Sequence, residues 1–218
     1  DVQIIFVQEG QHFVGSNPVL LDRAVRIVGN RSESALPDPT ALVPRIPDAE
    51  RLKDPDYSTV DLEYDSDRSR IYSDYGAPIF VVAASGVELA GLTLSQRLAF
   101  RPPPGRLTQK GLGAYCAVEF SRGSSVMTEC HVSSGAGIGI RVHSTADPLI
   151  RKCRVSYCNQ EGVWFTGECR GRLEDSSVAG CAGANVHIEE GADPEIHRNL
   201  IFGSTGDGVC ITRRGKGL

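Results

Sequence analysis

The stretch "GVWFTGECRGRLEDSSVAGCAGA", residues 162–184, is followed directly by "NVHIEEGADPEIHRNLIFGSTGD", residues 185–207, and the two share their apolar positions. Units that align in this way start at Ala117, Gly139, Gly162, Asn185 and Gly208. The spacings between the starts are 22, 23, 23 and 23 residues. Self-similarity at a fixed period of roughly 20 to 50 residues indicates a repeat architecture, so the repeat decides the fold.

Each unit opens with two apolar residues that are two positions apart. The first of these positions holds Val118, Ile140, Val163, Val186 and Val209. The second holds Phe120, Val142, Phe165, Ile188 and Ile211. Apolar residues at alternate positions, with polar residues between them, predict a strand that is buried on one face. Helical spacing does not fit this pattern.

A second group of apolar positions follows in each unit. One column contains Met127, Ile150, Leu173 and Ile196, and another contains Val132, Val155, Val178 and Ile201. Between these two columns stand Cys130, Cys153, Ser176 and Asn199. Small or amide side chains that are stacked at the strand spacing of about 4.8 Å can form an inward ladder of like contacts. Glycines and Asp-Pro pairs mark the turns between the strands.

A 23-residue unit of short strands cannot bury its own apolar face, so it must stack on its neighbours. The expected fold is therefore all-β, a single-stranded parallel β-helix or solenoid with coils of about 23 residues. Leucine-rich repeats have a similar length, but they need a recurring leucine scaffold that this chain lacks. An immunoglobulin-like or jelly-roll sandwich would not keep its columns in register over five units.

The pattern extends upstream less regularly. Residues 78–96 match one unit, and residues 4–7, 19–21 and 25–28 are expected strands of the opening coils. We therefore expect residues 1–218 to form a single β-helix domain. The chain starts within a strand pattern and ends in an unfinished unit, so we interpret it as a fragment of a longer chain.

Two insertions are expected between the coils. Residues 31–77 contain eleven acidic and six basic residues, five prolines and four of the six tyrosines. A loop of this length is usually a functional segment or a solvated, disordered one. As a docking segment it would offer Tyr57 and Tyr64 as anchors to a partner. Residues 96–111 are expected to form a shorter loop insertion.

Charge and hydropathy restrict the partners. The formal net charge is -4 and the isoelectric point is about 5.8, so no overall basic field would attract nucleic acid or an anionic membrane. The sequence contains no run of 18 or more apolar residues of the kind that spans a membrane. We therefore expect neither a nucleic-acid partner nor a membrane partner.

The seven cysteines indicate free thiols. Their number is odd, and they lack the short spacings of a small secreted domain, which favours a reducing compartment. The tight Cys-x-x-Cys spacing of metal sites is absent, and neither a metal nor a cofactor is expected. An intracellular location, cytoplasmic or nuclear, is therefore favoured over secretion, although the sequon at residues 30–32 leaves secretion open.

The outward positions of the first strands hold the candidate site residues. One outward column contains Glu119, Arg141, Trp164, His187 and Cys210, and the next contains Ser121, His143, Thr166, Glu189 and Thr212. Adjacent coils bring such side chains within reach of one another. His143, His187 and Glu189 would suit general acid and base catalysis, with Trp164 as a platform for a sugar ring.

A structural explanation competes with this enzymatic one. Glu129, Lys152, Asp175 and Arg198 alternate in sign along one column. Opposite charges on neighbouring strands are ordinary sheet stabilisation, and surface pairs contribute only about 0 to 1 kcal/mol each. Pectate-lyase or polygalacturonase chemistry would need several converging aspartates, whereas Asp207 stands alone. We therefore favour a protein that is not an enzyme and leave the question open.

The repeats resemble a known family. The stretches "TADPLIRKCRVSYCNQEGVWF", residues 145–165, and "GADPEIHRNLIFGSTGDGVCI", residues 191–211, are similar to the repeats of right-handed parallel β-helix proteins. The resemblance is closest to the β-helix region of F-box-only ubiquitin ligase subunits and to related carbohydrate-binding and sugar-hydrolase repeats. The resemblance covers the last hundred residues well and residues 1–30 more loosely, where residues 7–30 are similar to an opening coil of that family. The resemblance implies a right-handed helix.

In the F-box members the β-helix captures substrate proteins, while a separate F-box recruits the ligase core. No F-box is visible in this sequence. We therefore expect a non-catalytic β-helix that binds protein partners, as a substrate-recognition or scaffolding part of a larger assembly. Glu119, Arg141, Trp164 and His187 are the expected contact residues. The alternative is a polysaccharide lyase, hydrolase or epimerase that uses His143, His187 and Glu189 on a glycan.

Overall fold

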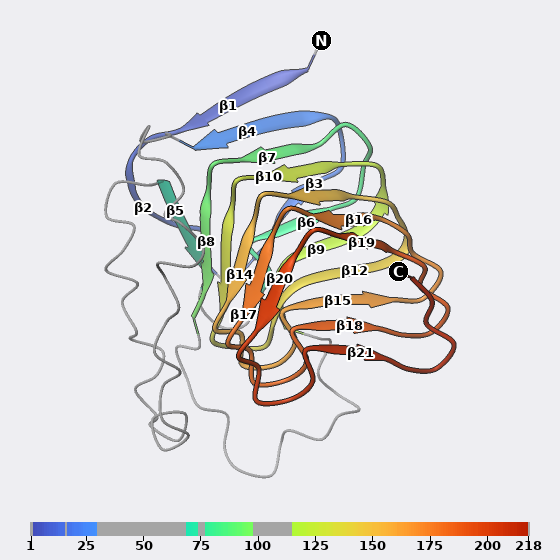
Figure 1. Cartoon of the computed structure of the whole chain (residues 1–218). Coiled ribbons are helices and arrows are strands. Elements are labelled where there is room, and N and C mark those ends of the chain that lie inside the picture. Colours follow the sequence, from blue (N-terminus) through green and yellow to red (C-terminus); the bar gives the residue numbers. More distant parts are fainter. Residues whose placement is uncertain (1, 16, 30–68, 74–76, 98–114, 218) are drawn as a thin grey trace.

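The structure is a computed structural model that describes residues 2–15, 17–29, 69–73, 77–97 and 115–217. These residues form three seven-stranded sheets in which every strand pair is parallel. Successive strands belong to successive sheets, so that each coil contributes one strand to each sheet (Figure 1). The molecule is a right-handed parallel β-helix, which confirms the fold class predicted from the repeat.

The first sheet contains β1 (Gln3–Val7), β4 (Val25–Gly29), β7 (Glu88–Ala90), β10 (Val126–Thr128), β13 (Leu149–Arg151), β16 (Arg172–Glu174) and β19 (Glu195–His197). The second contains β2 (Gly10–Phe13), β5 (Ser69–Ser73), β8 (Thr93–Gln96), β11 (His131–Ser134), β14 (Arg154–Ser156), β17 (Ser177–Ala179) and β20 (Leu200–Phe202). The third contains β3 (Val19–Leu21), β6 (Phe80–Val82), β9 (Cys116–Gly123), β12 (Ile138–Ala146), β15 (Val163–Thr166), β18 (Val186–Ile188) and β21 (Val209–Ile211).

The apolar columns of the third sheet follow the predicted register. Ile140 pairs with Val163 and Val142 with Phe165, and the same alignment continues through β18 to β21. Inward side chains are fully buried in the middle coils because a coil covers them on each side. In the last coil, where no further described coil follows, Ile211 is 49 % exposed.

The inward ladder lies where each coil turns from the first sheet into the second. The backbone N–H of Cys153 donates to Ser176 Oγ over 3.0 Å, and the N–H of Ser176 donates to Asn199 Oδ1 over 2.9 Å. Asn199 Nδ2 in turn donates to the carbonyl of Leu173 over 2.6 Å. The ladder therefore satisfies backbone groups that the turn removes from the sheets, and the predicted stacking of small and amide side chains is confirmed.

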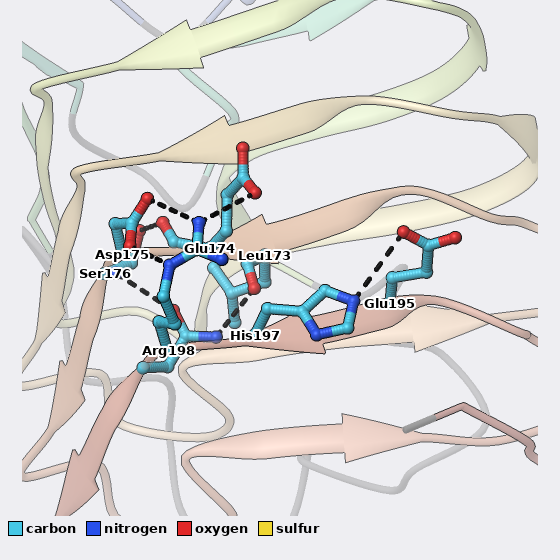
Figure 2. Close-up of polar contacts among 8 residues, drawn as sticks. Leu173, Glu174, Asp175, Ser176, Glu195, His197 and Arg198 are labelled. Carbon is cyan, nitrogen blue, oxygen red and sulfur yellow. Dashed lines mark hydrogen bonds and ion pairs between the residues drawn. The ribbon is translucent and has the colours of Figure 1, made fainter.

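The charged residue before each ladder position makes the turn itself. Glu129, Lys152, Asp175 and Arg198 have φ values of 53°, 51°, 49° and 52°, in the left-handed region. Arg198 donates to both carboxylate oxygens of Asp175, over 2.6 and 2.9 Å, and lies 3.4 Å from Glu174 (Figure 2). These pairs are exposed, as expected for a solvated charged column.

The structure moves the boundaries of both expected insertions. Residues 31–77 were expected to lie outside the coils, yet Ser69–Ser73 forms β5, which pairs with β2 and β8. Gln96, the first residue of the shorter expected loop, is buried at the end of β8 and donates to the carbonyls of Ala77 and Cys116. Side-chain hydrogen bonds of this kind do not recur from coil to coil, so the sequence repeat could not predict them. Residues 30–68 and 98–114, and with them Tyr57 and Tyr64, lie outside the described residues.

Replacing a buried column residue should destabilise the protein strongly. Ile188 is 1 % exposed on β18, between β15 and β21 in the third sheet. We expect Ile188→Ala to lower the free energy of unfolding by about 2 to 5 kcal/mol, because apolar burial is lost and a cavity is left. Urea unfolding followed by circular dichroism measures the difference.

Ile211→Ala is the matched control, since Ile211 occupies the same column one coil further on and is half exposed. It should cost less than about 1.5 kcal/mol, because much of the side chain already contacts solvent. Equal losses in the two variants would contradict the assigned register.

Candidate functional site

The outward face of the third sheet brings the predicted contact residues together. In the strand pairing of the third sheet, Arg141 lies beside Glu119 on β9 and beside Trp164 on β15. His187 follows on β18 and Cys210 on β21. Because side chains alternate across a strand, these residues point away from the core between the two buried columns. The predicted outward column is confirmed.

Three side chains of this column stack on one another. The guanidinium carbon of Arg141 lies 5.3 Å from the centre of the Trp164 ring. The rings of Trp164 and His187 are 6.0 Å apart and inclined by only 14°. A cation over an aromatic face and an offset ring pair are both attractive. We call Arg141, Trp164 and His187 the aromatic stack.

Each member of the aromatic stack has a buried nitrogen without a hydrogen-bond partner among the described residues. The three atoms are Arg141 Nε, Trp164 Nε1 and His187 Nδ1. His187 Nδ1 is 3.7 Å from Glu161 Oε1, which is an ion-pair distance but not a hydrogen bond. An unsatisfied buried polar group costs about 1 to 3 kcal/mol.

Carboxylates surround the aromatic stack. Glu119 Oε1 lies 2.8 Å from His143 Nε2, and Glu189 Oε2 lies 4.0 Å from His187 Nε2. Glu161 approaches the other ring nitrogen of His187. The site therefore combines an apolar platform and donor nitrogens with a negative rim.

Glu119 is held in its charged form. The hydrogen bond from His143 lowers the pKa of Glu119, and the nearby charges of His143 and Arg141 act in the same direction, against the opposing effect of burial. Cys116 Sγ lies 3.9 Å from Glu119 Oε2. Desolvation, followed by the charge of Glu119, raises the pKa of the Cys116 thiol, so this thiol remains protonated at neutral pH.

The residues of the enzymatic alternative fall into two places. His187 Nε2 contacts Glu189 at 4.0 Å and Thr212 Oγ1 at 3.1 Å. His143 instead bonds to Glu119 and to Ser144, each over 2.8 Å. His187 and Glu189 thus form one pair, and His143 belongs to a separate hydrogen-bonded chain.

Sequence reasoning missed Glu161 and Ser144. Glu161 precedes the unit start at Gly162, in a turn that has no place in the apolar columns. Ser144 follows the second outward column and meets His143 only because the strand is irregular there. Neither residue type nor spacing predicted these contacts.

The residues that the structure describes contain no group of three or more His, Cys, Asp or Glu side chains that could hold a metal ion. The described part of the chain likewise has no helix long and apolar enough to cross a membrane.

Comparison with known proteins gives one match. The family model for the right handed beta helix region matches residues 106–217, just over half of the chain. The matched segment includes β9 to β21 and therefore Glu119 and all three residues of the aromatic stack. No solved structure matches the chain.

The state of Glu119 can be measured directly. Its carboxyl signal in a pH titration by nuclear magnetic resonance should have a midpoint below the ordinary glutamate value of about 4.3. A lowered pKa in the folded state means that the interaction stabilises the protein above the unfolded pKa. This stabilisation is lost as the pH falls through the lowered folded value.

His143→Ala should move the Glu119 midpoint back up, because the largest lowering interaction is removed. A wild-type midpoint at or above the ordinary value would contradict the Glu119–His143 hydrogen bond.

Proposed function

The chain belongs to the right-handed β-helix family, and from this membership we propose that it is a rigid protein-interaction module that binds its partner on the outward face of the third sheet. The observation that supports the proposal most strongly is the aromatic stack, with its three unpartnered buried nitrogens. Tryptophan and arginine are the residue types that most often dominate the energetics of protein interfaces.

The fold favours binding by a preformed surface. Each strand of the aromatic stack is hydrogen-bonded to a parallel strand on both sides, so the side chains start from fixed backbone positions. A surface that is already ordered loses little conformational entropy on association. The stacked coils thus provide a stiff platform of the kind that solenoid proteins use for recognition.

The site also indicates the chemistry of the partner. Arg141 Nε and Trp164 Nε1 are donors without an acceptor among the described residues, and the backbone carbonyls of a peptide are acceptors. Glu119, Glu161 and Glu189 lie around the aromatic stack and favour lysine or arginine on the partner. The partner expected on these grounds is a protein segment with a basic side chain beside exposed carbonyl groups.

We propose further that the module recognises substrates within an F-box type ubiquitin ligase or a comparable assembly. The similarity of residues 145–165 and 191–211 to the repeats of F-box-only subunits supports this assignment. The acidic segment within residues 31–77 would then contact the same partner through Tyr57 and Tyr64.

An intracellular location is part of this proposal. None of the seven cysteines is in a disulfide, and all except Cys210 are buried. Structural disulfides persist in oxidising compartments and are rare in the cytosol and nucleus, so free thiols support a reducing compartment.

Thiol counting tests the location. In protein isolated from its own cells without reductant, each of these seven cysteines should be alkylated in denaturant, and in the folded state Cys210 should react first because the other six are buried. Peptide mass spectrometry identifies the alkylated positions. A cysteine among the seven that stays unmodified in denaturant would indicate a disulfide and an oxidising compartment.

Affinity capture with matched variants tests the binding face. Wild-type chain, Trp164→Ala and Arg141→Ala are compared with Arg172→Ala, which removes an exposed arginine from the first sheet instead. We expect the wild type and Arg172→Ala to retain the same partner proteins in equal amounts. Trp164→Ala and Arg141→Ala should retain these proteins at least about 30-fold less well, which corresponds to the loss of about 2 kcal/mol at an interface hot spot. Quantitative mass spectrometry of the retained proteins measures the change.

Equal retention by all four proteins would contradict the assigned face. Co-recovery of ubiquitin ligase subunits would support the ligase assignment, and a variant that lacks residues 31–68 shows whether the acidic segment contributes. Turnover of a polysaccharide that His187→Ala abolishes would instead favour the enzyme.

A further inference from the structure

The ladder between β9 and β12 contains a β-bulge. The register shifts between Val142 and Thr145, so that His143 and Ser144 together lie opposite Ser121. In a regular strand neighbouring side chains point to opposite faces of the sheet. A bulge re-aims a side chain, and bulges occur frequently beside active sites. The irregularity therefore allows two adjacent side chains to meet.

The bulge creates a continuous hydrogen-bonded chain of three side chains. Ser144 Oγ lies 2.8 Å from His143 Nδ1, and His143 Nε2 lies 2.8 Å from Glu119 Oε1. Ser144 is exposed, whereas the side chains of His143 and Glu119 are only 20 % and 21 % exposed. The serine at the end of the chain is accessible, and the two groups behind it are sheltered from water.

The charge of Glu119 determines the proton positions in this chain. Its pKa is lowered, mainly by the hydrogen bond with His143, so it is a carboxylate at neutral pH and can only accept hydrogen bonds. The hydrogen bond to this carboxylate places a proton on His143 Nε2, and Nδ1 is an acceptor when the ring is neutral. In the neutral ring the hydroxyl of Ser144 donates to Nδ1, which is the arrangement of a nucleophile, its general base and an orienting carboxylate.

We propose that Ser144, His143 and Glu119 form an acyl-transfer site that hydrolyses carboxylic esters. Ser144 is the nucleophile and His143 the general base, and both are catalytic residues. Glu119 is a positioning residue, because it acts through His143. The site is separate from the aromatic stack in its chemistry and goes beyond the proposed binding function.

The reaction balances with an ester and water. Ser144 Oγ attacks the acyl carbon while His143 Nδ1 takes the hydroxyl proton, and a new C–O bond forms. The bond from the acyl carbon to the alcohol oxygen then breaks, and His143 returns the proton to the departing alcohol. Water, deprotonated by His143, attacks the acyl-serine, which releases the carboxylic acid and restores the Ser144 hydroxyl.

A glycine of the next coil lies close to the backbone of Ser144. Ser144 has a φ of 59° and Gly167 a φ of 72°, and a Cβ on Gly167 would lie 3.5 Å from the Ser144 amide nitrogen. The amide of the nucleophile is a common donor to the oxyanion in acyl transfer.

The exposure of Ser144 limits the class of substrate. Its hydroxyl lies on the surface, where it can reach an ester carried by a large molecule. A small acyl group, such as an acetyl ester, is favoured over a long acyl chain, because a long apolar chain would need a deep apolar pocket to be desolvated.

The test uses a fluorophosphonate probe and 4-nitrophenyl acetate on the full chain. We expect one covalent adduct per molecule, located on Ser144 by peptide mass spectrometry, and ester turnover that Ser144→Ala abolishes. His143→Gln should lower kcat by about 100-fold or more, as expected for loss of a general base. Glu119→Gln should lower kcat at least about tenfold and leave KM within about twofold, because Glu119 orients the base without touching substrate.

Ser121→Ala is the matched control, since Ser121 lies opposite the bulge but its hydroxyl donates to the carbonyl of Val82. The fluorophosphonate probe should label this variant, and the variant should hydrolyse 4-nitrophenyl acetate, to the same extent as the wild type. Circular dichroism confirms that each variant is folded. Absence of an adduct on folded wild type, equal labelling of Ser144→Ala, or a Glu119→Gln effect on KM alone would overturn the proposal. No partner protein enters this assay, so its outcome is independent of the binding function.

Discussion

In-register parallel pairing of successive coils is the constraint on which the rest of the structure depends. Each strand hydrogen-bonds to the strands one coil before and one coil after it. From β9 onward, the residues paired across neighbouring strands therefore stand 22 or 23 positions apart in the sequence. In-register pairing places equivalent positions of successive coils next to one another, at a spacing of about 4.8 Å. Every buried column exists because the ladder holds this register, and inward side chains become exposed only in the terminal coils.

The same register organises the surface. Outward residues of successive coils come as close as inward ones, but their chemistry differs from coil to coil. In the turn between the first and second sheets this gives a line of charges in which Arg198 binds Asp175 and Glu174. On the third sheet it gives the aromatic stack, in which side chains of three successive coils contact one another. The period that packs the core thus also brings residues distant in the sequence onto one outward face.

Both proposed functions arise where the chain departs from its own repeat. The aromatic stack lies in an outward column whose other members are a carboxylate, Glu119, and a thiol, Cys210. The hydrogen-bonded chain of Ser144, His143 and Glu119 depends on the β-bulge in β12. Functional sites are expected where the chain departs from its repeat, because the coils of a perfectly regular solenoid would all present the same surface. The left-handed backbone at Ser144 is not by itself such a departure, since Gly167 and Glu190 in the following coils have it too.

The sequence alone determined the repeated coils of residues 117–211, their buried columns and the membership of the outward column. These features follow from a period and from alternation, which are local and repeated properties of the chain. It also indicated that Glu119, Arg141, Trp164 and His187 share one face. Only the tertiary structure decided that Ser69–Ser73 belongs to a coil, that Glu161 approaches His187 and that Ser144 bonds to His143. These depend on single hydrogen bonds and on a one-residue shift in register, which a one-dimensional pattern of apolar residues does not record.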